Sequence, residues 1–343
     1  MLTISLVTRG SPLQVTGGHL YHRRMAEAAA TRGASIDFIS ASVVRNPLRR
    51  VRDVALVDSL AAWCVAPWVV GRHRHHPLAA ILHQPPGGVG QRLVRTVVQR
   101  PFDLVVYRRC QLLISASQAL ADELVDAFDL PSDRIAVVEP GSDVPIDRTR
   151  VEDLRRGRRV AVVSVGNWLA NKGVLELLEA ISGLQPDRVT LHLAGQTDLD
   201  PGYGARVEAR LRAADLATRV VVHGPVTREE VGRLYAGADA FVLASHAETY
   251  GTVFGEALAA GVPVIGWRSG NLPNLIEDGQ EGCLVAPGDV AGLSRALERI
   301  ATDDQWRAQL RAAAARRGAA LPTRSATADV FFGALSRLAR SRD

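Results

Sequence analysis

Short apolar segments alternate with segments of helical periodicity along most of the 343-residue chain. The first part of the chain has strand-like segments at 2–8, 35–40, 78–85 and 111–117. The second part has them at 160–167, 189–195, 219–224, 240–245 and 262–267. Strands that alternate with helices pair in parallel and are covered by helices on both faces. The sequence therefore predicts an α/β protein with doubly wound parallel sheets.

A charged segment at 148–159 separates these two parts, and the chain is longer than one ordinary core fills. We therefore expect two Rossmann-like domains, residues 1–150 and residues 151–322. The C-terminal helix, within 323–343, either caps the second domain or crosses back to the first. Ligands of such sheets bind outside the carboxyl ends of the strands. Two facing domains would thus enclose a central cleft.

The composition, with 47% hydrophobic and 22% charged residues, indicates a soluble globular protein of the size of an enzyme. The longest apolar stretches are too short and too mixed for a membrane span, and the first ten residues lack a signal-peptide pattern. We expect a cytoplasmic protein. Its three cysteines are isolated from one another and from metal-ligand patterns, so we expect buried thiols.

The formal net charge of +5 resides entirely in residues 1–150. Two basic runs, at 45–52 and 71–76, could meet an anionic substrate or a membrane surface, which would place the protein peripherally on a membrane. A solvated arginine-rich face explains them equally well. Nucleic acid is not an expected partner, because aromatic residues make up only 5% of the chain and none interleave with these runs.

The strongest constellation for chemistry lies at 245–266, where Glu248 follows a predicted strand and Glu256 lies on the next helix. Between them, the turn at Tyr250 and Gly251 precedes a helix N-terminus, whose backbone N–H groups favour an anion. The carboxylates could accept hydrogen bonds from sugar or ribose hydroxyls. Without further evidence, two incidental acids in a strand-to-helix connection remain an alternative.

Other residues suited to a phosphate ligand lie elsewhere in the chain. Lys172, the only lysine among 41 basic residues, follows a strand and precedes a helix, so its compact ammonium could meet a phosphate. Gly17 and Gly18 lack Cβ atoms and would let the backbone approach a phosphate closely. His83 stands at the end of a predicted strand, where a histidine is either structural or functional.

The motifs of residues 160–300 closely resemble the donor half of family-4 retaining glycosyltransferases of GT-B fold. The resemblance rests on GNWLANKGVLELLEA (166–180), ETYGTVFGEALAAGVPVI (248–265) and NLPNLIEDGQEGCLVAPGD (271–289), in the family's order. The first half fits more loosely, through TGG, LHQP, ISAS and EPGSD. The resemblance implies a GT-B fold in which two Rossmann-like domains face a central cleft.

The resemblance also implies roles for the residues of the second half. Glu248 and Glu256 match the family's Glu-x7-Glu pair, which implies that the first faces the donor sugar and the second binds the ribose hydroxyls. Tyr250 and Gly251 would supply main-chain contacts to the donor. Lys172 matches the lysine that neutralises the donor diphosphate.

In the first half, the resemblance places Gly17 and Gly18 in a loop near the diphosphate, and His83 near the sugar and the acceptor. The chain departs from the family at Asn167, where an arginine is common. Asparagine can donate a hydrogen bond but carries no charge. The predicted phosphate clamp therefore has one cation fewer, and catalytic rate is more in question than donor binding.

We therefore expect a metal-independent enzyme that transfers a sugar from a nucleotide-diphosphate sugar to an acceptor hydroxyl, with retention implied by the resemblance. No cofactor is expected beyond the donor substrate. The sequence does not identify the acceptor, and the basic runs leave an anionic or membrane-associated acceptor open. A nucleotide-sugar epimerase, a phosphorylase and a nucleotide-sugar-binding protein with reduced catalysis remain alternatives. The sequence DLD at 198–200 resembles a metal-binding DxD motif, but its place in a loop argues against a metal.

Overall fold

The computed structural model describes residues 1–9, 17–70, 76–88, 93–142, 144–149 and 151–341. The chain forms two compact units, one of Met1–Gly141 with Pro322–Asp343 and the other of Ser142–Leu321. The boundary thus lies nine positions before the one we expected at 150, and the last helix belongs to the first unit. We call the two units unit 1 and unit 2.

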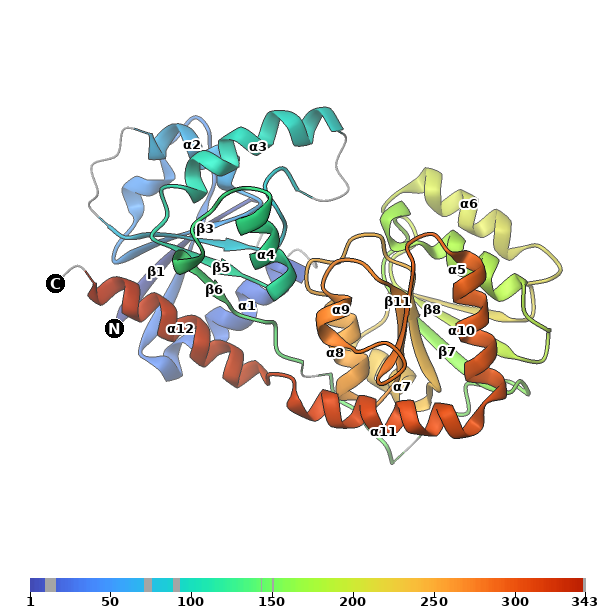
Figure 1. Ribbon diagram of the computed structural model, residues 1–343. Helices are drawn as coiled ribbons and strands as arrows, with labels where there is room; N and C mark the ends of the chain where they lie inside the picture. The colour runs from blue at the N-terminus through green and yellow to red at the C-terminus, as the bar shows by residue number, and fades with distance from the viewer. Residues whose placement is uncertain (10–16, 71–75, 89–92, 143, 150, 342–343) are drawn as a thin grey trace. The chain divides into compact units, whose positions relative to one another are not determined.

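Unit 1 is built on a six-stranded parallel sheet in the order β2-β1-β3-β4-β5-β6 (Figure 1). Its strands are β1 (Leu2–Thr8), β2 (Ala34–Ser40), β3 (Val54–Asp58), β4 (Leu78–Leu82), β5 (Leu112–Ser115) and β6 (Ile135–Val137). Its helices are α1 (Gly17–Ala29), α2 (Ala62–Val69), α3 (Leu93–Tyr107), α4 (Gln118–Asp126) and α12 (Arg324–Arg340), with 3-10 turns η1 (Ala30–Arg32), η2 (Pro47–Arg50) and η3 (Ser132–Arg134).

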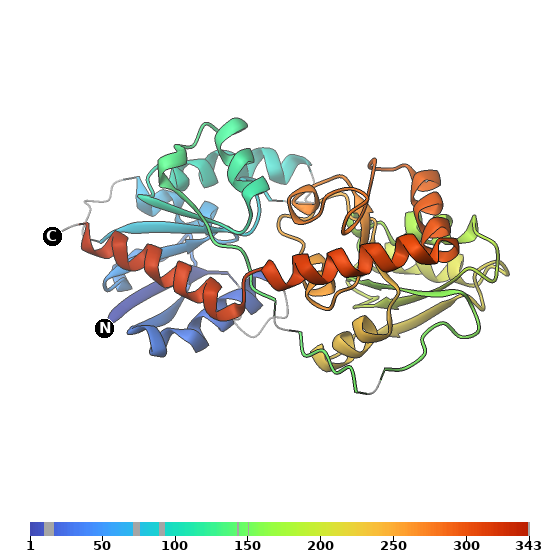
Figure 2. The same cartoon turned by 60° about the horizontal axis from the view of Figure 1, so that its bottom comes forward.

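Alternating apolar side chains of these strands fill two cores, one on each face of the sheet. Leu56 points into the core beneath α1 and α12, where it meets Tyr21 and Phe331. Its neighbour Val57 points into the opposite core, beneath α2, α3 and α4. Figure 2 shows α12 running along the sheet of this unit. Strand β3 was not among the predicted strands, although it is central to the sheet.

Unit 2 is built on a second six-stranded parallel sheet, in the order β12-β11-β10-β7-β8-β9. Its strands are β7 (Val160–Val165), β8 (Val189–Ala194), β9 (Val220–Gly224), β10 (Ala240–Leu243), β11 (Val264–Trp267) and β12 (Gly282–Val285). Its helices are α5 (Val174–Ser182), α6 (Pro201–Leu211), α7 (Arg228–Gly237), α8 (Thr252–Ala259), α9 (Leu272–Leu275), α10 (Val290–Thr302) and α11 (Asp304–Ala320), with the 3-10 turn η4 (Ala170–Lys172).

The sheet of unit 2 is also covered on both faces, so the predicted doubly wound α/β class is confirmed. Leu177 and Leu293, from α5 and α10, pack against one face of the sheet. On the other face, Phe241 of β10 makes edge-to-face ring contacts with Tyr235 of α7 and Phe254 of α8. The strand order reverses between β7 and β10, which in such sheets is where ligands bind.

Three further sequence predictions concern the surface and the interior. Cys64, Cys110 and Cys283 are buried free thiols, as expected. Within the described part of the chain, every helix falls short of the length and apolar content that a membrane crossing requires. The second basic run lies almost entirely outside the described residues, because its positions 71–75 are among those not described.

Candidate functional site

The candidate donor site lies in unit 2, at the carboxyl ends of the two strands where the strand order reverses. Lys172 ends the 3-10 turn η4, which follows β7, and Glu248 lies in the loop that follows β10. The ammonium group of Lys172 donates to Oε1 of Glu248. The structure therefore brings together two predicted site residues that are 76 positions apart in the chain.

Backbone contacts fix the turn that carries Lys172. Gly173 has a left-handed φ of 64°, and a Cβ atom there would lie 2.0 Å from the carbonyl oxygen of Ala244. The carbonyl oxygen of Asn171 accepts hydrogen bonds from the Ser245 hydroxyl (3.0 Å) and from the His246 N–H (2.9 Å). The loops after β7 and β10 are thus bound to each other, and this holds the lysine beside the glutamate.

The side chains of Lys172 and Glu248 are partly buried. Their side chains keep 23% and 14% of their accessible surface. At this exposure a charge interacts more strongly with a neighbouring charge than it would at the surface. An anionic ligand that reaches the site would meet a compact cation that is already held in place.

The N-terminus of α8 lies between the two predicted acids in the chain. Gly251 precedes the helix with a left-handed φ of 79°, and a Cβ there would lie 2.5 Å from Cδ2 of Phe254. Gly251, the N-cap residue, has no side chain with which to cap the first turn of this helix. Its first backbone N–H groups therefore form the kind of helix end at which anions bind.

Glu256 is buried on α8, with 6% of its surface exposed. Arg228, the first residue of α7, donates from Nη1 to Oε1 of Glu256 at 3.3 Å. The start of α7 is fixed by a capping box between Thr227 and Glu230. Arg228 was not among the predicted site residues. Its place inside the Thr-x-x-Glu capping motif of 227–230 indicated its position at the start of a helix but not its contact with Glu256.

Tyr250 is buried, and its carbonyl oxygen accepts a hydrogen bond from Nδ2 of Asn271 (3.3 Å). The backbone N–H of Asn271, which is fully buried, donates to the carbonyl oxygen of Glu248 (3.1 Å). Asn271 thus donates hydrogen bonds to two main-chain carbonyl groups of the loop that carries Glu248 and Tyr250.

Asn167 follows β7, and its Oδ1 accepts a hydrogen bond from the backbone N–H of Gln196 at 3.1 Å. Gln196 in turn accepts from the N–H of Trp168 at 2.8 Å. The side chain at the position where the family often has arginine therefore joins the loops that follow β7 and β8. This structural contact could not be read from the motif.

In unit 1, the predicted residues lie at the carboxyl ends of the strands. Gly17 begins α1 and the preceding positions 10–16 lie outside the described residues. His83 follows β4 and is partly buried, and a Cβ on Gly18 would lie 3.2 Å from its Cδ2. Gly18 therefore lets the backbone of α1 approach the imidazole ring.

Two residues that sequence reasoning left without a role lie beside His83. His22 of α1 places its Nε2 3.0 Å from Nε2 of His83, and Asp58 at the end of β3 places Oδ2 3.8 Å from Nδ1 of His22. Burial lowers the pKa of His22 to about 3 and also lowers the pKa of His83. Both rings are therefore neutral near pH 7.

The DLD sequence has a structural explanation. Oδ1 of Asp200 accepts a hydrogen bond from the backbone N–H of Tyr203 at 3.0 Å and so caps the N-terminus of α6. This use of the carboxylate accounts for an aspartate in the loop without reference to a metal.

Two Rossmann-like units, each built on a six-stranded parallel sheet covered by helices, are typical of glycosyltransferases of GT-B fold. Residues 159–303 match the family model described as "Glycosyl transferases group 1". The protein resembles sucrose-phosphate synthase from Thermosynechococcus elongatus over 100% of both chains, with 19% identity and a TM-score of 0.83. It resembles Anabaena HepE, solved with UDP-glucose, over 98% of this chain and 100% of that one, with 17% identity and a TM-score of 0.81. These structures show the fold.

Sequence relatives give the family. The chain is 30% identical to the D-inositol 3-phosphate glycosyltransferase of Xylanimonas cellulosilytica over 296 residues, which are 81% of this chain and 70% of that one. It is 32% identical to the glycogen synthase of Mycobacterium tuberculosis over 249 residues, 70% of this chain and 58% of that one. The chain belongs to the family-4 glycosyltransferases, and the sequence-based assignment of an enzyme of this class is confirmed.

Proposed function

We propose that the protein transfers a sugar from a nucleoside-diphosphate sugar to an acceptor hydroxyl. In this reaction the bond between the anomeric carbon and the diphosphate breaks, a bond to the acceptor oxygen forms, and the hydroxyl proton is released. Negative charge grows on the departing diphosphate, so catalysis requires cations and N–H dipoles aimed at it.

The observation that carries the proposal is the Lys172–Glu248 pair, which lies at the carboxyl ends of β7 and β10, where the strand order of unit 2 reverses. A diphosphate in this position would compete with Glu248 for the ammonium of Lys172. The released carboxylate would then be available to the hydroxyls of the donor sugar. The N-terminus of α8, which begins after Gly251, would supply further hydrogen bonds to the phosphate oxygens.

Glu256 is proposed to bind the ribose hydroxyls of the donor. Its contact with Arg228 supports this role, because the guanidinium pairs with the buried carboxylate and holds it in place. The solved complexes of Anabaena HepE with UDP and with UDP-glucose support a nucleotide-sugar donor for this chain. A binding panel would identify the base and the sugar of the donor.

Retention of the anomeric configuration is proposed from family membership alone. Metal independence is proposed because the chain offers its own cation, Lys172, and a helix N-terminus where other enzymes use a divalent ion. Product analysis by NMR would give the anomeric configuration. Activity that persists after exhaustive treatment with EDTA would support a reaction without metal, and activity restored only by Mg²⁺ or Mn²⁺ would contradict it.

The acceptor is proposed to be anionic or membrane-associated. The net positive charge of residues 1–150 supports it, as does the match to relatives named for D-inositol 3-phosphate. A cytoplasmic enzyme, peripheral at a membrane surface, is consistent with such an acceptor. Glycosyl transfer to inositol phosphates, compared with transfer to the uncharged inositol, would test the charge preference directly.

The comparisons do not favour the alternatives of an epimerase, a phosphorylase or a binding protein with reduced catalysis. One observation, the uncharged Asn167, still favours a binding protein with reduced catalysis. Binding of a donor without release of nucleoside diphosphate, across donors and acceptors, would distinguish a binder from an enzyme.

The test begins with a thermal-shift panel of UDP-, GDP- and ADP-sugars, because a ligand that binds the native state raises its stability. With the best donor, Lys172→Met and Glu256→Gln should each lower kcat/KM by at least about tenfold. Arg188→Met is a matched control for Lys172→Met. Arg188 is also 23% exposed and pairs with Glu298 (2.9 Å) and with its chain neighbour Asp187 (3.1 Å), but it lies directly before the amino end of β8.

Unchanged kinetics in both site variants, with the fold intact, would refute the site assignment. An equal loss in Arg188→Met would show that any removed ion pair disturbs the unit, and would also remove support for the assignment.

A further inference from the structure

The reversal of strand order in unit 1 lies between β1 and β3, and three buried or partly buried polar side chains meet there. Asp58 ends β3, His83 follows β4, and His22 reaches them from α1. Asp58 is fully buried and His22 is 2% exposed, whereas His83 is partly exposed. The three side chains therefore form a line from the interior of the unit toward its surface.

Hydrogen-bond donors hold both carboxylate oxygens of Asp58 in place. Its Oδ2 accepts from the Thr8 hydroxyl at 2.6 Å. Its Oδ1 accepts from the backbone N–H of Leu60 at 3.1 Å and from the Ser59 hydroxyl at 3.3 Å. These bonds fix the orientation of the carboxylate, so that the negative charge of Oδ2 faces Nδ1 of His22.

This charge determines which nitrogen of His22 carries the proton. A neutral imidazole has one N–H donor and one acceptor nitrogen. Nδ1 of His22 faces Oδ2 of Asp58 at 3.8 Å, and no hydrogen-bond partner of Nδ1 is found in the described residues. A lone pair on Nδ1 would be repelled by the carboxylate, whereas an N–H there is attracted to it. The proton of His22 therefore lies on Nδ1, and its Nε2 is an acceptor.

The same logic extends to His83. The two Nε2 atoms of His22 and His83 are 3.0 Å apart, which is a hydrogen-bond distance. If Nε2 of His22 accepts, Nε2 of His83 must donate. Nδ1 of His83 is then the acceptor nitrogen, and the described residues provide no hydrogen bond to it.

We propose that Asp58 and His22 are positioning residues that hold the ring proton of His83 on Nε2, so that Nδ1 of His83 accepts a hydrogen bond from a substrate hydroxyl. The part of this inference that concerns the hydroxyl rests on the proposed glycosyl transfer. The part that concerns the proton does not, because it follows from the contacts within unit 1. We refer to Asp58, His22 and His83 as the histidine relay.

The relay explains the geometry better than a bound metal ion does. The three side chains are the one group in the described part of the chain whose ligand atoms lie close enough to hold an ion. However, both oxygens of Asp58 already accept hydrogen bonds from protein groups. The facing Nε2 atoms of the histidines are likewise at the distance of a direct hydrogen bond.

Selective ¹⁵N labelling of histidine tests the relay, because the ring ¹⁵N shifts distinguish the two neutral tautomers. Assignment would use His22→Gln and His83→Gln. In the full-length wild-type protein near pH 7.5, we expect His22 protonated on Nδ1 and His83 on Nε2. The opposite tautomer at His83 in this spectrum would overturn the proposal without any variant.

Asp58→Asn provides the perturbation. The amide keeps an oxygen for the Leu60 N–H, but it can place an NH₂ group opposite Nδ1 of His22. We expect both tautomers to reverse, so that the proton of His83 moves to Nδ1. With the donor and acceptor found in the transfer assay, kcat should fall by about tenfold or more while the donor KM is unchanged, as for loss of a correctly oriented acid–base group.

Thr8→Val is the matched control, since it removes a hydrogen bond to the same Oδ2 and keeps the negative charge. Its tautomers and its kcat should remain those of the wild type. Unchanged tautomers in Asp58→Asn would refute the relay, and so would ZnCl₂ binding that shifts both histidine signals. If no donor is turned over, the proposed function fails, but the tautomer measurements still decide the relay.

Discussion

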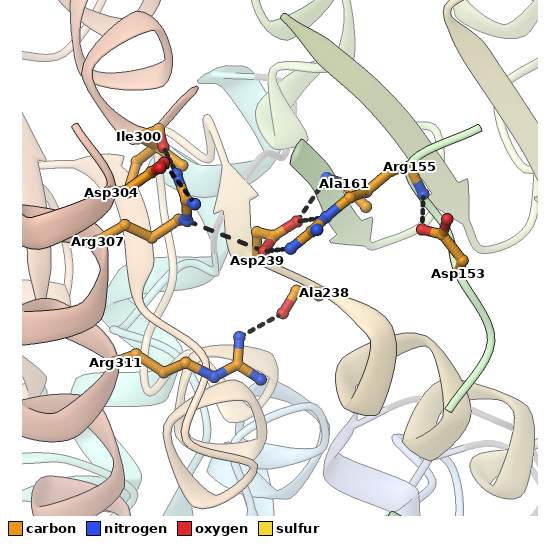
Figure 3. Close-up of polar contacts among 9 residues, drawn as sticks. All are labelled: Asp153, Arg155, Ala161, Ala238, Asp239, Ile300, Asp304, Arg307 and Arg311. Carbon is orange, nitrogen blue, oxygen red and sulfur yellow. Dashed lines mark hydrogen bonds and ion pairs between the residues drawn. The ribbon is translucent and has the colours of Figure 1, made fainter. Parts of the chain in front are cut away.

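The arginine cluster around Asp239 in unit 2 allows a stability prediction with a magnitude. Asp239 directly precedes β10, at the end of the strand opposite Glu248, and its side chain is 8% exposed (Figure 3). Its Oδ2 accepts from the backbone N–H of Ala161 at 2.9 Å and from Nε of Arg155 at 3.0 Å. Its Oδ1 accepts from Nη2 of Arg155 at 2.7 Å and lies 3.9 Å from Nε of Arg307.

The predicted perturbation is Asp239→Ala, which removes all of these contacts. The largest cost comes from the N–H of Ala161, because a buried donor left without its charged acceptor loses about 1.5–3 kcal/mol. The pair with Arg155 adds at most about 1 kcal/mol, since that side chain is 47% exposed and screened by water. We expect the free energy of unfolding of unit 2 to fall by roughly 3 kcal/mol.

Urea unfolding, followed together with hydrogen exchange of peptides from β7 and β10, would measure this loss within unit 2. Asp304→Ala is the matched control: Asp304 contacts the same Arg307 at 2.8 Å but is 74% exposed, so its removal should cost under about 0.5 kcal/mol. A loss below about 1 kcal/mol in Asp239→Ala would refute the reasoning. So would equal losses in the two variants.

Three further predictions concern single sites. Asn167→Arg should raise kcat, because it adds the missing cation, but lower stability by about 1 kcal/mol through loss of the 3.1 Å bond to Gln196; equal or lower turnover would contradict the missing-charge argument. Burial raises the pKa of Asp103 to about 6, above its unfolded value of 3.8, so the native state binds the extra proton and wild-type stability falls as pH rises between about 4 and 6. Asp103→Asn removes this loss. In urea unfolding, the free energy of unfolding of the variant minus that of the wild type should therefore rise by up to roughly 3 kcal/mol between pH 4 and pH 7.5. A difference that does not change with pH would refute the raised pKa of Asp103. Gly173→Ala should weaken donor binding as measured by calorimetry, because the added Cβ would displace the turn of Lys172 from Ala244. Unaltered affinity would show that the turn tolerates the added Cβ.

Lys172 and Glu248 of the candidate donor site could be predicted because each lies in the segment that follows a strand. In a parallel sheet the carboxyl ends of all strands lie at one edge, so Lys172 after β7 and Glu248 after β10 must lie near that edge. Their direct contact then follows from the adjacency of β7 and β10. Arg228 escaped prediction because its contact with Glu256 depends on how α7 and α8 pack, which no local pattern specifies.

The relay in unit 1 escaped prediction for a different reason. The strand β3 and the helix α2 follow each other so closely that their apolar residues merge into one stretch. Asp58 therefore lies within one mixed apolar stretch, and the sequence does not mark it as the last residue of a strand. Without β3 in the sheet, nothing placed Asp58 beside His22 and His83.

The structure also changes what Asn167 implies. The two cations that the described residues place at the donor site already lie against carboxylates, Lys172 against Glu248 and Arg228 against Glu256. These pairs carry no net charge, so a diphosphate must draw Lys172 away from Glu248. An arginine at position 167 would add a cation without a carboxylate of its own, which would make that exchange easier. We therefore expect Asn167→Arg to increase donor affinity more in the wild-type background than in Glu248→Gln, because Lys172 is already released in Glu248→Gln. Equal gains in donor affinity in the two backgrounds would show that the Lys172–Glu248 ion pair does not compete with the donor.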